Sequence, residues 1–84
     1  MATTKTIQSL ERAFSILELF QNGKPEMSLK EIADTIQLNK STTFGLVNSL
    51  TTLGYLFQNE DNQKYSLGLK ILSLTNAVKM NNIL

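Results

Sequence analysis

The 84-residue sequence contains no cysteine and no histidine. The absence of cysteine excludes disulfides, thiolate catalysis and zinc–thiolate sites, and it suits a reducing compartment. The absence of histidine removes the commonest general base and the commonest metal ligand. The sequence also has no glycine-rich phosphate loop and no pair of carboxylates at a catalytic spacing. We therefore expect no enzymatic activity, no catalytic or metal-binding residues and no cofactor.

Long apolar segments are missing as well. No stretch approaches the ~18 apolar residues that a membrane-spanning helix needs, and residues 1–6 lack the apolar centre of a signal peptide. We therefore expect a cytoplasmic protein with no membrane partner. A hydrophobic content of 42% and a charged content of 18% are typical of a globular chain. The length allows one domain with a small core.

Acidic residues are absent from residues 35–59, although the net charge of the whole chain is only +1. That net charge is well below the strongly basic value expected of a stand-alone nucleic-acid-binding protein. The distribution is more informative than the sum, because it keeps negative charge off one long segment. We expect the surface formed by this segment to face a negatively charged partner, with double-stranded DNA as the leading candidate.

The first helical pattern covers residues 10–21. Ser9 is suited to cap this helix, and Gly23 in the left-handed conformation, followed by Pro25, is suited to end it. Apolar residues recur at helical spacing and predict one broad buried face. Its members are Leu10, Ala13, Phe14, Ile16, Leu17 and Phe20. Leu19 lies off this face.

Two further helices follow, separated by a short turn. Ser28 and Glu31 have the spacing of a capping box at the start of the second helix, which is expected to end near Thr35. Asn39 is a good cap for the third helix, over residues 40–53. The predicted inner face of the third helix consists of Thr43, Leu46, Val47, Leu50 and Leu53.

A hairpin pattern comes next, with strands over residues 55–58 and 64–67 and Glu60 and Asp61 at its tip. Its three aromatic residues are expected to pack in the core and across the strands rather than to stack on bases. They are Tyr55, Phe57 and Tyr65. A last helix over residues 69–82 is apolar on two sides, so one side is expected to meet a second subunit or a further domain.

This order of elements predicts a mainly α fold with a small β-hairpin. The arrangement is a winged helix-turn-helix with a three-helix core and a two-stranded wing, followed by a linker helix. In such a fold the second helix of the motif lies in the DNA major groove, and its N-terminal residues meet the base edges. The recognition helix is therefore expected over about residues 40–53.

Five residues of this helix are candidates for DNA contacts. Lys40 suits a phosphate or guanine, Ser41 and Thr42 suit phosphate or base, and Asn48 suits adenine. Phe44 would need an apolar partner such as a thymine methyl or a sugar face. Each of these residues also has a structural alternative: the hydroxyls only assist the helix cap, Phe44 packs on the core or in a protein contact, and Lys40 is an ordinary solvated lysine.

Three candidates lie outside the recognition helix. Ser28 can cap its helix and also bind a phosphate. Arg12 projects from the first helix, beside a phosphate path or in an ion pair with Glu11 or Glu18. Lys64 can contact DNA from the wing if the acidic pair at the tip points away.

Five motifs in order resemble the N-terminal domain of IclR-type bacterial transcription regulators. They are residues 6–13 (TIQSLERA), 28–33 (SLKEIA), 40–42 (KST), 53–55 (LGY) and 65–68 (YSLG). The resemblance covers about residues 6–75. It implies a DNA-binding domain over residues 9–68, preceded by an N-terminal arm over residues 1–8. Residues 69–84 would then form a linker helix toward an effector-binding domain that is absent from these 84 residues.

The resemblance also implies function. Such regulators are dimers or tetramers that bind palindromic operators, repress or activate transcription, and respond to a small-molecule effector through the second domain. By this resemblance Lys40, Ser41 and Thr42 match the start of the recognition helix, while Ser28 and Arg12 match contacts to the DNA backbone.

Two departures from the family pattern reduce the number of base-reading groups. Gly45 stands where a basic residue is common, and Phe44 stands where a polar or imidazole side chain is usual. The alternative function is a winged helix used for contact with another protein. The low net charge, Phe44 and the two-sided last helix motivate it.

Overall fold

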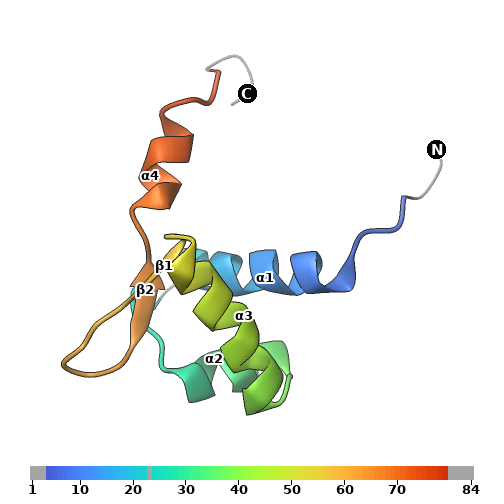
Figure 1. The fold of residues 1–84 in the computed structure, drawn as a ribbon, viewed down its shortest axis with the longest axis vertical. Helices are drawn as coiled ribbons and strands as arrows, with labels where there is room; N and C mark the ends of the chain where they lie inside the picture. Colours follow the sequence, from blue (N-terminus) through green and yellow to red (C-terminus); the bar gives the residue numbers. More distant parts are fainter. Residues whose placement is uncertain (1–3, 23, 80–84) are drawn as a thin grey trace.

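The computed structural model describes residues 4–22 and 24–79, which form three packed helices and a two-stranded antiparallel wing (Figure 1). The helices of the core are α1 (Gln8–Leu19), α2 (Leu29–Ile36) and α3 (Lys40–Thr52), with a 3-10 turn, η1 (Phe20–Asn22), after α1. The wing consists of β1 (Leu56–Gln58) and β2 (Tyr65–Leu67), and α4 (Lys70–Thr75) follows it. The predicted winged helix-turn-helix fold is confirmed.

The start of α1 differs from the prediction. Ile7 is the residue that caps the helix, and it does so without a side-chain hydrogen bond. The backbone N–H groups of Leu10 and Glu11 both donate to the Ile7 carbonyl, which places Ser9 inside the first turn. The predicted Ser9 cap is therefore wrong. The predicted stop at Gly23 lies outside the described residues.

Side chains cap α2 and α3 as predicted. The Glu31 N–H donates to Ser28 Oγ at 3.1 Å, and the Ser28 N–H donates to Glu31 Oε1 at 2.8 Å. The Thr42 N–H donates to Asn39 Oδ1 at 2.7 Å. Between the helices Gln37 adopts a left-handed conformation with φ of 59°, which is uncommon for a residue with a Cβ and which turns the chain sharply.

The core is centred on one fully buried residue from each helix: Ile16, Ile32 and Val47. Tyr65 of the wing joins this cluster, and a backbone bridge between Met27 and Tyr65 ties the wing to the segment before α2. Thr43 is the buried polar residue, and its hydroxyl donates to the Asn39 carbonyl at 2.9 Å. Its polar group is therefore satisfied inside the core.

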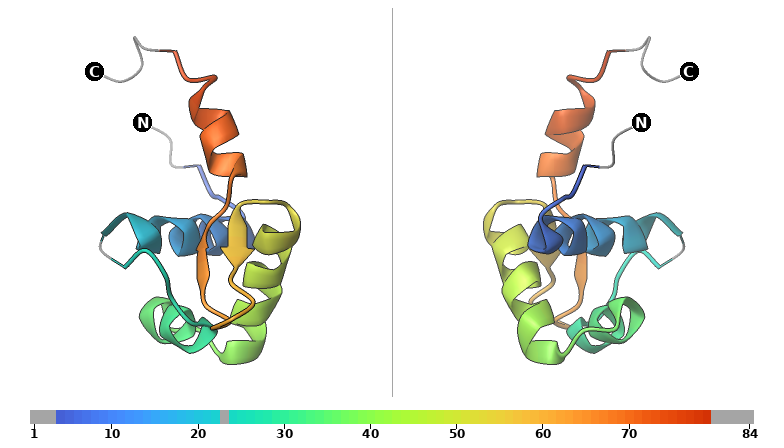
Figure 2. Two further views of the ribbon diagram at one scale, coloured as in Figure 1. Left: turned by 90° about the vertical axis from the view of Figure 1, so that its left-hand side faces the viewer. Right: turned by 90° about the vertical axis from the view of Figure 1, so that its right-hand side faces the viewer.

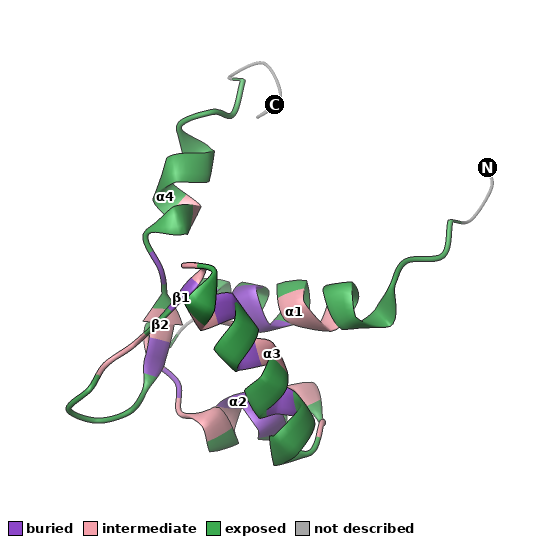
Figure 3. Ribbon diagram, in the orientation of Figure 1, coloured by how far each residue is buried: buried purple, intermediate pink, exposed green. Residues whose placement is uncertain are grey.

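Four apolar residues that were predicted to be buried are exposed instead. Leu10 and Phe14 lie on the part of α1 that extends past the core, where Figure 3 shows mainly exposed surface. Leu53 follows the last turn of α3 and is exposed. Phe57 alternates with buried Leu56 along β1, so it occupies the uncovered face of a two-stranded sheet. Leu19, predicted to lie off the buried face, packs against the core.

The last helix is shorter than predicted. α4 ends at Thr75, a turn follows at residues 76–77, and residues 80–84 lie outside the described part of the chain. Ile71 packs against the core, whereas Leu69, Leu72, Leu74 and Val78 are exposed. Figure 2 shows α4 standing away from the body of the domain. The partner predicted for its second apolar side remains a prediction.

Two glycines join the end of α3 to the start of α4. Gly54 has φ of 92°, and its carbonyl oxygen accepts a hydrogen bond from the Lys70 N–H at 3.2 Å. Gly68 lies directly against this peptide, and a Cβ at Gly68 would overlap the Gly54 carbonyl oxygen. The positive φ explains the glycine of the LGY motif, and the close approach explains the glycine of the YSLG motif.

Substituting Gly68 by alanine should destabilise the fold. We expect Gly68→Ala to lower the free energy of unfolding by about 1–3 kcal/mol, because the backbone at Gly54 has to move to admit the methyl group. Gly45→Ala is the matched control: its Cβ meets no atom within 4 Å, and alanine should raise the stability of the helix by roughly 0.5–1 kcal/mol. Urea denaturation measures both, and equal effects of the two substitutions would contradict this packing.

Candidate nucleic-acid interface

The outer side of α3 is polar and free of acidic residues. Ser41, Gly45, Asn48 and Thr52 follow the spacing i, i+4, i+7 and i+11, and all four are exposed. The opposite side carries Thr43, Val47 and Leu50, which are buried in the core. Figure 3 shows exposed residues, in green, recurring along the length of the α3 ribbon. The helix therefore presents one complete face to a partner.

The N-terminus of α3 carries three exposed candidates. Lys40, Ser41 and Thr42 form its first turn. Asn39 alone supplies the side-chain cap, and no hydrogen bond among the described residues uses the Ser41 or Thr42 hydroxyl. A hydroxyl can donate one hydrogen bond and accept two. Both hydroxyls and the backbone N–H groups of Lys40 and Ser41 are consequently available to hydrogen-bond acceptors on a ligand, whereas the Thr42 N–H is used by the Asn39 cap.

Phe44 and Gly45 lie side by side one turn later. The Phe44 side chain is 50% exposed and does not belong to the group of apolar residues that pack against the core. Gly45 leaves open space around its Cα. The possibility that Phe44 packs on the core is therefore not realised in this structure.

The N-terminus of α2 forms a second polar corner. The Lys24 ammonium contacts Glu31 Oε2 at 2.6 Å, and Glu31 also completes the Ser28 capping box. The hydrogen bond from Lys24 and the one from the Ser28 backbone lower the pKa of Glu31 to about 2, with a smaller contribution from the charge of Lys64. Lys24 thus pairs directly with this carboxylate beside Ser28, and Lys64 of the wing adds a weaker attraction from further away. This arrangement was not predicted, because Lys24, Glu31 and Lys64 belong to three different segments of the chain.

Arg12 lies beside the turn between α2 and α3. It lines a shallow hollow with Ser15 of α1 and with residues 35–38. Neither of the two ion pairs among the described residues includes Arg12, so the alternative pairing with Glu11 or Glu18 is absent there. Its partly exposed side chain remains open to a ligand.

The amides of the wing tip bond mainly within the wing, and the Asn62 side-chain amide also donates to Glu26 Oε1 at 3.4 Å. Asn59 Oδ1 accepts from the Asp61 N–H, Asn62 Oδ1 accepts from the Lys64 N–H, and Gln63 Nε2 donates to the Glu60 carbonyl. Gln63 adopts a left-handed conformation with φ of 63°. These bonds hold the turn and leave the Lys64 ammonium as the cationic group of the wing.

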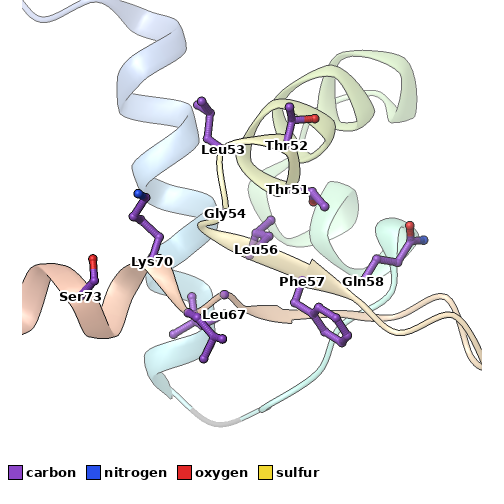
Figure 4. Close-up of a pocket in the computed structure, with 12 residues that line it drawn as sticks. Thr51, Thr52, Leu53, Gly54, Leu56, Phe57, Gln58, Leu67, Lys70 and Ser73 are labelled. Carbon is purple, nitrogen blue, oxygen red and sulfur yellow. The ribbon is translucent and has the colours of Figure 1, made fainter.

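Two hollows lie away from these candidates. The groove in Figure 4 runs between the end of α3, the outer face of the hairpin and α4, and it includes Leu53, Phe57, Leu67 and Lys70. A second hollow of about 300 Å³ between α1, α3 and α4 is lined almost entirely by apolar side chains, among them Phe14 and Leu74. The periodicity of the sequence assigned Phe14 to the core and Leu74 to one face of the last helix. The second hollow, which brings the two residues together, was therefore not predicted.

Two further kinds of function find no support in the described residues. Within residues 4–22 and 24–79, no three His, Cys, Asp or Glu side chains gather into a group that could hold a metal ion. No helix in this part of the chain is long and apolar enough to cross a membrane.

Comparison with known proteins gives consistent matches. Residues 9–60 match the family described as the IclR helix-turn-helix domain. The transcriptional regulator XynR of Escherichia coli (strain K12) is 42% identical over 66 residues, which are 79% of this chain and 26% of XynR. The glycerol operon regulatory protein of Streptomyces griseus is 38% identical over 73 residues, 87% of this chain and 29% of that protein.

A solved structure gives the same picture. The crystal structure of an IclR family transcriptional regulator from Brucella abortus superposes with a TM-score of 0.79 at 29% identity, covering 92% of this chain and 31% of that one. The chain thus spans between a quarter and a third of the length of the relatives it matches.

The Glu31 carboxylate should make stability depend on acidity. Because the pKa of Glu31 falls from its ordinary value of 4.5 to about 2 in the folded protein, its stabilising contribution is complete above pH 4.5 and is lost as the pH falls toward 2. NMR titration of the side-chain carboxyl should give a midpoint near 2, and Lys24→Met should move it upward. A midpoint near 4.5 in the unmodified protein would contradict the capping and ion-pair geometry.

Proposed function

We propose that α3 is the recognition helix of a sequence-specific DNA-binding domain. The chain belongs to the IclR family of helix-turn-helix transcriptional regulators. Members of this family bind DNA and are not enzymes. The observation that carries this proposal is the outer face of α3. This face is exposed over its whole length and has no acidic residue. It begins with a lysine and with two hydroxyl groups that make no hydrogen bond to any other described residue.

We place the N-terminal turn of α3 in the major groove. The groove is roughly 12 Å wide and admits one helix. Lys40 contacts a phosphate or a guanine, and Ser41 and Thr42 bond to phosphate or base edges. Asn48 lies two turns after Ser41 on the same side, and its amide suits the donor and acceptor pair of adenine.

The backbone contacts come from the elements around α3. The Ser28 hydroxyl accepts a bond from Glu31 but retains its own proton for a phosphate oxygen. At this corner the Lys24 ammonium, which is paired with Glu31, and the Lys64 ammonium of the wing are the cationic groups that a phosphate would meet. Arg12 contacts the backbone beside the α2–α3 turn, and Lys64 is the contact from the wing.

We further propose that the protein acts on a palindromic operator as a dimer, or as a tetramer in a full-length protein. Two-fold symmetry places two recognition helices in successive major grooves. The apolar hollow between α1, α3 and α4 supports this proposal. Leu10, Phe14, Leu53 and Leu74 around it are each at least half exposed, and an apolar surface rimmed by several helices is typical of a subunit contact.

The domain division follows from the same proposal. We assign residues 9–68 to the DNA-binding domain, residues 1–8 to an N-terminal extension whose last residue, Gln8, already begins α1, and residues 69–84 to a connection toward an effector domain. The effector domain would bind a small molecule and change the arrangement of the two DNA-binding domains. These two relatives are about three times as long as the present chain, which leaves room for such a domain in a full-length protein.

Replacing Lys40 should weaken binding to every DNA sequence. Lys40→Ala removes one ammonium from the phosphates, so the slope of log affinity against log salt should become shallower by about 1. Fluorescence anisotropy over a salt series on a duplex selected from random DNA measures this slope. The charge-neutral comparison is Thr42→Ala, which should cost about 1–3 kcal/mol on the selected duplex and little on random DNA. If the selection yields no preferred sequence, sequence-specific binding is wrong.

A charge in the apolar hollow should weaken the dimer. Leu74 lines the hollow at 51% exposure, whereas Leu72 on the same helix is 62% exposed and lies outside it. We expect Leu74→Lys to raise the dimer dissociation constant by about tenfold or more, because each subunit then buries a lysine in place of an apolar side chain. Sedimentation equilibrium measures the constant, and Leu72→Lys should leave it unchanged. Equal effects of both variants would exclude the hollow as the subunit contact.

A further inference from the structure

Two neighbouring residues on α3, Phe44 and Gly45, have no role in the contacts of the proposed function. Among residues 40–52, Phe44 is the large apolar side chain that stays exposed, at 50%, and Gly45 beside it has no side chain at all. We propose that Phe44 is a specificity residue that recognises the C5-methyl group of a thymine in the major groove, with Gly45 providing the clearance for close approach. This inference rests on the proposed placement of α3 in DNA.

The position of Phe44 supports a contact with a base. Lys40 precedes it by four residues and Asn48 follows it by four, so the ring lies on one side of the helix between two polar side chains that face outward. A partner surface that contacts both Lys40 and Asn48 therefore also contacts the Phe44 ring. An exposed phenyl ring gains free energy when water is removed from it, and it therefore favours a partner with apolar atoms at this point.

The chemistry of the groove narrows the choice of partner. Base edges in the major groove present hydrogen-bond donors and acceptors, and thymine adds a methyl group. A phenyl ring has no hydrogen-bonding group, so it distinguishes bases through this methyl group alone. Sequence discrimination by Phe44 consequently means a preference for thymine at one position of each half-site.

Gly45 allows the ring to reach that depth. A Cβ built on Gly45 meets no atom within 4 Å, so packing within the domain does not require glycine there. Glycine inside a helix is less favourable than alanine, and it is often found where a ligand approaches the backbone closely. Because Gly45 lies on the outer stripe with Ser41 and Asn48, its missing side chain lets α3 settle further into the groove.

Deoxyuridine provides the test, because it differs from thymidine only by lacking the C5-methyl group. Starting from a duplex selected from random DNA, each thymine of one half-site is replaced in turn. We expect the affinity of the unmodified protein to fall about fourfold at one position, the value for loss of one buried methyl group. Phe44→Ala should bind the thymine and uracil duplexes of that position equally well.

The controls separate this inference from the proposed function. Phe44→Leu keeps an apolar contact and should keep a response to the methyl group, whereas Gly45→Ala should bind the duplex less tightly although its helix is more stable. Equal affinity for thymine and uracil at every position would overturn the inference, even where salt-dependent, sequence-specific binding persists. A Phe44→Ala variant that alters the oligomeric state and leaves DNA affinity intact would overturn it as well, in favour of a protein contact.

Discussion

The burial of one face of α3 is the constraint on which the rest of the structure depends. Val47 and Thr43 are fully enclosed against residues such as Ile16 of α1 and Ile32 of α2. A helix has two faces, and in a domain of this size the core can cover only one of them. Fixing the inner face therefore fixes the direction of every outward side chain of α3, including those that we assign to DNA.

Local hydrogen bonds then set where each helix begins. The capping box at Ser28 and the Asn39 cap satisfy backbone donors at the N-termini of α2 and α3, and the left-handed Gln37 makes the turn between them. The two helix starts are also the places that carry the candidate phosphate contacts. Structural capping and ligand binding use the same ends of the helices, because both depend on the donors that a helix leaves unsatisfied there.

The exposed apolar surface has a different origin. α1 extends past the core, and α4 leaves the domain after Ile71 has packed against the core. Between them lies the apolar hollow that we propose as the subunit contact. The polar face of α3 and the apolar hollow lie on different parts of the surface, so DNA binding and subunit contact need not compete for the same residues.

The order of the elements, the Ser28 and Asn39 caps, and the acid-free outer face of α3 follow from the sequence. Each of these depends on residues within a few positions of one another, and local spacing is visible in one dimension. The exposure of Leu10, Phe14, Leu53 and Phe57, the short α4, and the ion pair of Lys24 with Glu31 follow only from how the segments pack in three dimensions. Periodicity identifies an apolar face, but only the packing of distant segments decides whether anything covers it. The contact of Gly68 with the Gly54 peptide likewise depends on two segments that are distant in sequence.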